Sequence, residues 1–416
     1  MRIAVVGSGI SGLAAAFVLQ REHEVAVFES SERVGGHTHT VDIEIGGRSY
    51  AVDTGFVVYN EATYPNFVRL LDLLGVGSQP TSMSFSVRCD ATGQEYCGSS
   101  PNTLFAQRRN LLRPGFYRLI LDILRFNTAA SRALARGRVA GTLGEYLARE
   151  VPSPRLKREY LVPLVAAIWS MAPGRVDEFP AEFFLRFAAR HRLLQARERL
   201  PWRVIRGGSR EYVRALTARL RGPVRTRSPV RSIRRVEEGV ELRIANGEPE
   251  RFDRVVVATH SDEALRLLAD PSDAEREVLS AFPYQENAAV LHQDEDLLPR
   301  APRARANWNY RIRREARGDA PPLTTYDMRG LQGLDAPRPI LITLNDEGAV
   351  APARVLERLR YSHPVYDPRT VEAQGERDRI SGPRRTHYCG AYWGFGFHED
   401  GLASALHACR DFGLAL

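Results

Sequence analysis

The residues with the clearest chemical meaning are three glycines near the start of the chain, in the spacing G-x-G-x-x-G. They follow an apolar run, 2–6, which predicts a buried strand, and they lead into an alanine- and leucine-rich run, 13–21, which predicts a helix. Gly7 permits a tight turn, Gly9 lets a pyrophosphate approach the backbone, and Gly12 lets the helix lie close to the strand. The pattern therefore predicts a dinucleotide-binding turn rather than a merely structural one.

A carboxylate stands where such a site needs one. A second apolar strand, 25–28, is followed by Glu29, 22 positions after Gly7, and this spacing is typical of the acid that binds the adenosine ribose hydroxyls. Its negative charge would repel a 2′-phosphate, which argues against a phosphorylated nicotinamide cofactor. Ser11 lies in the glycine turn directly before the helix, whose unpaired N–H groups and positive dipole end favour phosphate.

A glycine pair follows the second strand almost at once. Arg33 precedes Gly35 and Gly36, and His37 and Thr38 come next. Two glycines let the backbone pass beneath an extended ligand that continues from the pyrophosphate, which suits the ribityl chain of FAD. A plain β-turn is the alternative interpretation.

The fingerprint, the acid and the Arg-x-Gly-Gly extension resemble the flavin-dependent amine oxidase superfamily, which also includes the phytoene-desaturase-like enzymes. Four further segments resemble a bacterial group of FAD-dependent, or NAD/FAD-binding, oxidoreductases within it. They are HTHT at 37–40, DTGF at 53–56, AAIWS at 166–170 and HEDG at 398–401. The resemblance runs along nearly the whole chain and implies FAD and redox chemistry, without indicating a substrate.

The resemblance also implies roles for particular residues near the flavin. The segment that matches 53–56 passes close to the isoalloxazine ring, so Thr54 and Gly55 are expected there; a strand end with a turn glycine is the alternative. The strand near Val230 is expected to contact the adenine through its backbone.

A glycine- and aromatic-rich segment, 386–402, resembles the closing FAD segment of the same enzymes. A helix is expected to begin near Gly401, with its N-terminus facing the pyrimidine edge of the flavin, where negative charge builds on reduction. The cofactor-binding residues expected in this segment are Trp393, Glu399, Asp400, Gly401 and Leu402.

The expected reaction is transfer of a hydride from a C–H bond of a hydrophobic substrate to flavin N5, and a fatty acyl or other lipid chain is one such substrate. Carbon–carbon dehydrogenation also needs a base for the second proton. His398 is the first candidate for this catalytic role, with Tyr59 and Tyr326 behind it.

Other functions stay open at this point. A flavin amine oxidase is one alternative, but many such enzymes place a lysine near N5, and the only lysine here is Lys157, in a charged run far from any flavin motif. A non-catalytic FAD-binding partner protein is another alternative. A nicotinamide dehydrogenase without flavin is disfavoured by Gly35, Gly36 and Gly401.

A chain of 416 residues is too long for one compact core, so two domains are expected. We predict an α/β fold in which a Rossmann-like FAD-binding domain (1–60, 200–275 and 376–416) is interleaved with an α+β substrate domain (61–199 and 276–375). The second domain is expected to combine a mixed sheet with helices.

The formal net charge of +8 comes from 58 basic residues, of which all but Lys157 are arginine. No recognition motif accompanies the arginines, so no nucleic acid is expected as a partner. The region from Thr103 to Arg136 reads as a basic amphipathic helix broken at Pro114 and Gly115. It either packs on its own domain or makes a peripheral contact with an anionic membrane.

No run of 18 apolar residues is present, so no transmembrane helix is expected, and the predicted location is the cytoplasm, with peripheral contact at the inner face of the membrane as an addition. The four cysteines form no C-x-x-C pair and no histidine spacing indicates zinc, so no metal is expected. Reduced thiols are expected, with a contact between Cys89 and Cys97 across a hairpin as the alternative.

Overall fold

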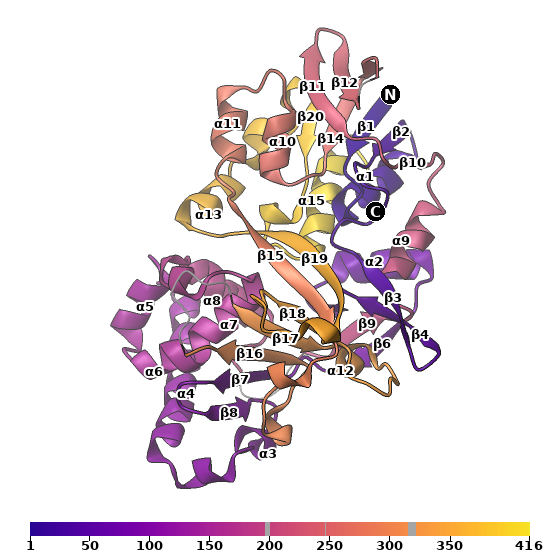
Figure 1. The fold of residues 1–416 in the computed structure, drawn as a ribbon. Helices are drawn as coiled ribbons and strands as arrows, with labels where there is room; N and C mark the ends of the chain where they lie inside the picture. The colour runs from indigo at the N-terminus through magenta and orange to yellow at the C-terminus, as the bar shows by residue number, and fades with distance from the viewer. Residues whose placement is uncertain (196–199, 246, 315–321) are drawn as a thin grey trace.

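The computed structural model describes residues 1–195, 200–245, 247–314 and 322–416, and its elements are organised around two large sheets (Figure 1). The first sheet is parallel, with the strand order β10-β2-β1-β14-β20. Its strands are β1 (Arg2–Val6), β2 (Glu24–Phe28), β10 (Val224–Arg225), β14 (Arg254–Val257) and β20 (Thr386–Tyr388). Because these strands come from the beginning, the middle and the end of the chain, the sheet is assembled from three separate segments.

Two helices from opposite ends of the chain pack together on one face of this sheet. They are α1 (Ile10–Leu19) and α15 (His398–Arg410), and both contribute to one apolar core with α2 (Pro65–Leu74) and α9 (Arg210–Thr217). A second core covers the other face. It contains residues of β11 (Val230–Val236), β12 (Gly239–Ile244), β13 (Glu250–Phe252), α10 (Ser261–Leu267) and α11 (Asp273–Leu279).

The second large sheet is mixed, with the order β19-β15-β18-β17-β16-β7-β8, and every neighbouring pair is antiparallel except β7 with β16. Its strands are β7 (Phe85–Cys89), β8 (Gln94–Cys97), β15 (Tyr284–His292), β16 (Trp308–Ile312), β17 (Leu323–Asp327), β18 (Leu341–Leu344) and β19 (Val355–Pro364). The long strands β15 and β19 extend from the parallel-sheet half into this half (Figure 1).

Helices cover the second sheet and share one apolar core with Tyr310. They are α4 (Pro114–Ala135), α5 (Leu143–Glu150), α7 (Val162–Trp169) and α8 (Ala181–Arg190). The architecture confirms the predicted α/β class with an added mixed sheet and helices, whereas the limits of the two domains stay a prediction.

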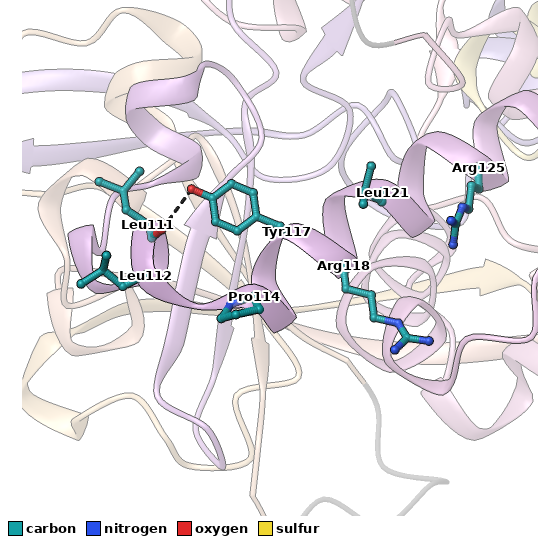
Figure 2. Close-up of a pocket in the computed structure, with 7 residues that line it drawn as sticks. All are labelled: Leu111, Leu112, Pro114, Tyr117, Arg118, Leu121 and Arg125. Carbon is teal, nitrogen blue, oxygen red and sulfur yellow. Dashed lines mark hydrogen bonds between the residues drawn. The ribbon is translucent and has the colours of Figure 1, made fainter.

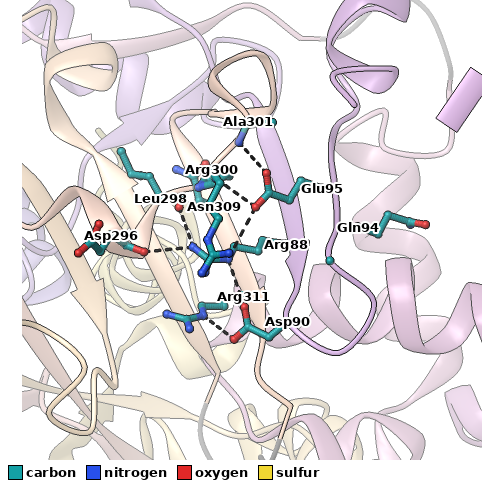
Figure 3. A network of polar contacts seen from close by, with 12 residues as sticks. Arg88, Asp90, Gln94, Glu95, Asp296, Leu298, Arg300, Ala301, Asn309 and Arg311 are labelled. Carbon is teal, nitrogen blue, oxygen red and sulfur yellow. Dashed lines mark hydrogen bonds and ion pairs between the residues drawn. The ribbon is translucent and has the colours of Figure 1, made fainter. Parts of the chain in front are cut away.

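A buried polar network joins the hairpin β7–β8 to the later part of the chain (Figure 3). The Arg88 guanidinium donates to the carbonyls of Asp296 (3.1 Å) and Leu298 (2.9 Å) and pairs with Asp90 and Glu95. The Glu95 carboxylate also accepts from the backbone N–H of Ala301 at 2.7 Å. The network fixes together two segments that lie about two hundred residues apart in the sequence.

The strands not yet assigned form two further small sheets. One is a hairpin in which β3 (Thr40–Ile45) pairs with β4 (Arg48–Asp53) across a turn at Gly46 and Gly47. A three-stranded sheet contains β5 (Val58–Tyr59), β9 (Trp202–Ile205) and β6 (Ser78–Thr81).

The structure refines two local predictions. The strand expected near Val230 is β11, and it is separated from β10 in the parallel sheet because Pro229 lacks an N–H and Arg227 has a φ of +50°. The final helix α15 begins at His398, three residues before the expected start, because the Asp400 carboxylate accepts the Phe397 N–H at 2.9 Å.

The Ser209 side chain does not cap α9, because its N–H and hydroxyl both donate to the buried Asp53 carboxylate at 2.8 Å. Cys89 pairs with Gln94 and Cys97 pairs with Ser86 across the hairpin, and both thiols are free, so the alternative contact between them is wrong.

The region 103–136 forms α3 (Pro101–Leu104), the 3₁₀ helix η1 (Arg108–Leu112) and α4, so the predicted break at Pro114 is confirmed. Within the described part of the chain, no helix has both the length and the apolar character needed to cross a bilayer.

Candidate functional site

The glycine turn between β1 and α1 has the geometry that a phosphate cradle requires. Gly7 has a φ of +101°, and a Cβ there would lie 2.8 Å from the Ala258 carbonyl oxygen. A Cβ on Gly12 would lie 1.9 Å from the Gly7 carbonyl oxygen, so only glycine lets the helix start this close to the turn. Gly9 differs, because a Cβ there would have no described atom within 4 Å except its neighbours. A side chain would therefore clash at Gly7 and at Gly12, whereas the space beside Gly9 is free for a ligand.

The helix N-terminus beside this opening has no side-chain cap. Gly9 is the N-cap of α1, and no side chain accepts a hydrogen bond from its first turn. The free N–H groups and the positive end of the helix dipole suit an anionic ligand.

Glu29 follows β2 and is held beside the same turn. Its carboxylate accepts hydrogen bonds from Ser8 N (3.1 Å), Ser8 Oγ (2.5 Å) and Ser31 N (2.9 Å). Burial opposes the charged form, but the hydrogen bonds from Ser31 and Ser8 outweigh it and lower the pKa of Glu29. The group is therefore a fixed negative charge, which fits ribose hydroxyls and opposes a 2′-phosphate.

The second glycine pair crosses against the first turn. Gly35 and Gly36 have φ values of +121° and +59°, and a Cβ on Gly36 would lie 3.0 Å from Gly9 Cα. The Arg33 guanidinium fixes this crossing by donating to the carbonyls of Thr38 (2.7 Å) and Gly36 (2.8 Å). The alternative interpretation, a plain surface turn, would not require the backbone at Gly36 to lie this close to the backbone at Gly9.

The first turn of α15, near the end of the chain, packs against the glycine turn and the start of α1. The Ser11 hydroxyl donates to the Gly401 carbonyl at 2.9 Å, and a Cβ on Gly401 would lie only 2.9 Å from the Ser11 Oγ. Two helix N-termini therefore meet at this side of the parallel sheet. In the loop before α15, Trp393 Nε1 is buried and has no hydrogen-bond partner among the described residues.

These features fit a dinucleotide cofactor. Gly9 leaves space for a phosphate, and the first N–H groups of α1 are free to bind it. Glu29 supplies a charged carboxylate, and the buried Trp393 indole N–H has no hydrogen-bond partner among the described residues. Which of the predicted residues contact the cofactor stays a prediction.

His398, the first residue of α15, is enclosed by side chains from three other segments. Its Nε2 lies 2.7 Å from the Tyr212 hydroxyl and 3.2 Å from Thr38 Oγ1, and its ring stacks on Phe56 with centroids 3.8 Å apart. Burial lowers the pKa of His398 to about 3, so the ring is neutral near pH 7.

The other two catalytic candidates lie in different surroundings. Tyr59 packs edge-on against Phe67 at 5.3 Å, and the same Phe67 ring contacts His398 at 5.5 Å, so the fold brings these two candidates into one aromatic group. Tyr326 lies on β17 and stacks with Trp308 at 6.1 Å, apart from that group.

The segment after the glycine pair contacts the segment after β4. The Thr54 N–H donates to the His39 carbonyl, and a Cβ on Gly55 would lie 2.1 Å from the His37 carbonyl oxygen. The tight contact explains why position 55 requires glycine.

Three further residues predicted to bind the cofactor lie in β11 and α15. Val230 opens β11, and Leu402 is fully buried in α15. Glu399 accepts from the N–H groups of Asn66 (3.1 Å) and Phe67 (3.0 Å) at the start of α2, so it also has a structural task that the sequence did not indicate.

Sequence reasoning also missed a group of three half-buried histidine residues. The His37 ring centroid lies 5.7 Å from that of His260 and 5.5 Å from that of His363, and His37 Nε2 lies 3.2 Å from the Ser362 carbonyl oxygen. Burial lowers the pKa of all three rings, which are therefore neutral. Within the described ranges, no group of three or more His, Cys, Asp or Glu side chains could hold a metal ion.

These three histidines could not be recognised as a group from the sequence, since each lies more than one hundred residues from the other two and no local motif links them. Tyr212, which binds His398, gave no signal, because its position on α9 reads as ordinary helix packing.

The family of the chain follows from a comparison with known proteins. The model of the family described as flavin containing amine oxidoreductase matches residues 10–296, and the chain belongs to this family. A relative from Mycobacterium tuberculosis, which carries the name flavin-containing monoamine oxidase AofH, is 28% identical over 282 residues. That match covers 65% of this chain and 59% of the relative, so the chain spans about three fifths of the relative's length.

Solved structures of similar fold include three whose names indicate different substrates. Putrescine oxidase bound to putrescine has a TM-score of 0.71 at 16% identity, with 99% of both chains covered. A fatty acid isomerase from P. acnes has a TM-score of 0.68 at 17% identity, covering 99% of this chain and 98% of the isomerase. Cyclohexylamine oxidase from Brevibacterium oxydans has a TM-score of 0.69 at 16% identity, covering 99% of both chains. At these identities the likeness concerns the fold alone.

Family membership confirms the predicted superfamily, the flavin cofactor FAD and the class of flavin-dependent oxidoreductases. The substrate is a separate question, which the residues of the second half of the fold address.

Proposed function

We propose that this chain is an FAD-dependent oxidoreductase that acts on a hydrophobic substrate, with a fatty acyl or other lipid chain as the preferred class. The observation that carries the proposal is an aromatic wall between the loop before α15 and the helices of the second half. Its members are Trp169, Phe183, Phe187, Tyr366, Phe395 and Phe397.

The wall is fixed directly to the proposed cofactor-binding loop. The Trp169 indole donates to the Phe395 carbonyl at 3.0 Å, and the Phe187 and Phe397 rings stack with centroids 5.2 Å apart. Since most of α7 and the apolar side of α8 are buried in one core, we expect the wall to be rigid and to exclude water. Such a lining suits a flexible hydrocarbon, and because aromatic faces also attract cations, the preference for a lipid over an amine rests on the other observations below.

A surface pocket of about 510 Å³ borders this wall at Phe395 and offers a route to it. Apolar residues of α4 and its following turn form one side, among them Leu134 and Val139. On the α8 side, Arg190 lines the pocket together with Arg186, whose guanidinium pairs with the Glu182 carboxylate in the same pocket. An acyl chain with an anionic head group matches this combination.

Bound FAD would supply an acceptor for a hydride from a substrate C–H bond, and the protein would supply binding, orientation and a dry site. The phosphates would lie at the Gly9 turn and the start of α1, and Glu29 would hold the ribose hydroxyls. The start of α15 would face the flavin ring with its free N–H groups.

For His398, the geometry favours orientation of neighbouring groups over proton abstraction. A pKa of about 3 makes the ring a weak base at neutral pH, and its Nε2 is already within hydrogen-bonding distance of Tyr212 and Thr38. The base therefore stays a prediction, with Tyr59 and Tyr326 as the other candidates.

Amine oxidation is the second candidate function, supported by the family name and by the named relative. Against it, Lys157 is the only lysine, and it pairs with Asp177 at a half-exposed position rather than at the cradle. Glu399 and Asp400, the two acids in the first turn of α15, accept backbone N–H groups instead of facing a ligand amine.

The proposal is tested by incubating the holoenzyme with fatty acids, phospholipids and amines and analysing the products by mass spectrometry. A fatty acyl product that has lost two hydrogens is expected. An aldehyde from an amine, with every lipid unchanged, would overturn the proposal in favour of amine oxidation. A bound flavin that no compound reduces would favour the non-catalytic alternative.

A further inference from the structure

Exposed apolar side chains gather on one short stretch of the fold. Eight large apolar side chains are exposed among the described residues, and five of them lie between 111 and 124: Leu111, Leu112, Tyr117, Leu121 and Leu124. The Leu112 side chain is the most open, at 88% exposed. We call these five the leucine patch. A contiguous apolar patch on a protein surface marks a site of interaction.

The leucine patch is not the face by which α4 packs on its own domain. Phe116, Leu119 and Phe126 are each about 1% exposed and point into the two adjoining cores. Leu121 and Leu124 lie on other sides of the helix, since successive residues are separated by about 100°. The helix therefore has one apolar side that its own domain covers and a second that nothing described covers.

The patch has a defined shape. Pro114 separates η1 from α4, and the Tyr117 hydroxyl donates to the Leu111 carbonyl at 3.1 Å across this break (Figure 2). The leucines of η1 are thereby fixed beside those of α4, along an open pocket of about 660 Å³. Because the leucine patch is already fixed in place, its side chains would lose little conformational entropy on binding.

Positive charge surrounds the patch. Residues 101–138 contain eight arginines and a single carboxylate, Asp122. That carboxylate is buried and accepts the Ser153 hydroxyl at 2.8 Å, so it adds little negative charge to the surface. Arg118 and Arg125 line the pocket itself, and both side chains extend away from α4 in Figure 2.

We propose that η1 and the first half of α4 dock on an anionic phospholipid bilayer. The leucine patch would enter the boundary between head groups and acyl chains, while Arg113 and Arg118 would lie against the phosphates. A bilayer fits because it offers an apolar interior directly behind an anionic layer, which is the order of groups on this surface. The proposal goes beyond the proposed function and does not depend on it, because docking is a property of the surface.

The test is flotation of the holoenzyme with vesicles of phosphatidylglycerol and phosphatidylcholine, compared with vesicles of phosphatidylcholine alone. Binding to the anionic vesicles is expected, and it should weaken as sodium chloride is raised. The double variant Leu111→Ser/Leu112→Ser should lose at least about tenfold in partitioning. The double variant Arg113→Gln/Arg118→Gln should lose about fivefold per arginine.

Matched controls separate the patch from general effects. Leu73→Ser removes a leucine that is 48% exposed on α2, and Arg243→Gln removes an exposed arginine on β12; both should bind as the parent does. All variants should keep the bound flavin and the melting temperature, since the residues are exposed.

Three outcomes would overturn the proposal. The first is no binding of the parent protein to anionic vesicles, and the second is equal binding by the patch variants and the parent. The third is a dimer or a protein complex in solution that Leu112→Ser dissolves, because the patch would then have a protein occupant. Loss of lipid oxidation with intact vesicle binding would instead count against the proposed function alone.

Discussion

The Ser11 hydroxyl donates a hydrogen bond to the Gly401 carbonyl at 2.9 Å, and this contact joins the first helix of the chain to the last. It places the free N–H groups of α1 and of α15 on one side of the parallel sheet. One ligand could therefore contact both ends of the sequence, and the candidate cofactor site needs both α1 and α15 in place.

Gly9→Ala should abolish flavin binding without unfolding the protein. The backbone at Gly9 has a φ of −67° and ψ of −179°, which alanine adopts readily, and the added methyl group meets no described atom. It would, however, occupy the space through which a pyrophosphate approaches. We expect the flavin content to fall at least about tenfold, with the melting temperature of the apoprotein unchanged within ~2 °C.

Two glycine variants are the comparisons for this experiment. Gly77→Ala, at a second open position, should keep both flavin and stability. Gly401→Ala should lower the free energy of unfolding by about 1–3 kcal/mol, because its Cβ lies 2.9 Å from Ser11 Oγ. If Gly9→Ala retains its flavin, the phosphates do not lie at this turn.

Lys157→Met should leave the rates of flavin reduction and reoxidation within about twofold of the parent. The Lys157 ammonium pairs with Asp177 at a half-exposed position, and a surface pair of this kind contributes about 0–1 kcal/mol to stability. Stopped-flow absorbance measures both rates. A large loss of either rate would place this lysine at the flavin and would favour amine oxidation.

His398→Gln should retain most activity if the ring orients its neighbours rather than taking a proton. Glutamine can still accept from the Tyr212 hydroxyl, so we expect a rate within about tenfold of the parent, whereas loss of a general base costs about 10²–10⁴-fold. The pH profile of flavin reduction should also be the same in both proteins.

His398→Ala is the contrasting variant, and it should lose flavin content as well as rate, because the Phe56 ring loses its stacking partner. A rate for His398→Gln as low as that of a general-base deletion, with flavin content intact, would restore His398 as the base.

The protein should lose stability as the pH falls from about 6.5 to 4. Burial lowers the pKa of His292 to about 4, so in this window the unfolded chain binds a proton that the folded chain does not, and stability rises with pH. Asp53 and Asp400, whose pKa values burial raises to about 6, oppose this trend below pH 6.

The variant His292→Asn isolates one contribution to this pH dependence. Comparing urea unfolding at pH 5 and pH 7.5, we expect the variant to lose about 1–2 kcal/mol less than the parent does. His292 is fully buried and bonded to Thr343, so the variant should be less stable overall at pH 7.5. An identical pH dependence in both proteins would contradict the neutral state of this ring.

The contiguous parts of the cofactor site were predictable because their geometry is local. Gly7, Gly9, Gly12 and Glu29 lie in one strand–turn–helix–strand unit, and the spacing along the chain fixes their arrangement in space. The same holds for the hairpin β3–β4, whose turn requires two residues of positive φ.

Contacts between distant segments were not predictable. Tyr212, Tyr361 and His363 surround the site from α9 and β19, and no local pattern distinguishes them from packing residues. The amphipathic pattern of α4 likewise gives the angle of each side chain around the helix. It does not show which side a neighbour covers, and for this reason the outward leucines became visible only in the fold.

The central claim is tested most directly by anaerobic mixing of the purified holoenzyme with fatty acyl lipids and, separately, with primary and secondary amines. The account predicts that the long-wavelength absorption band of the flavin bleaches with a lipid and persists with every amine. Bleaching by amines alone would contradict the lipid assignment, and a protein that neither carries nor takes up FAD would contradict the cofactor site itself.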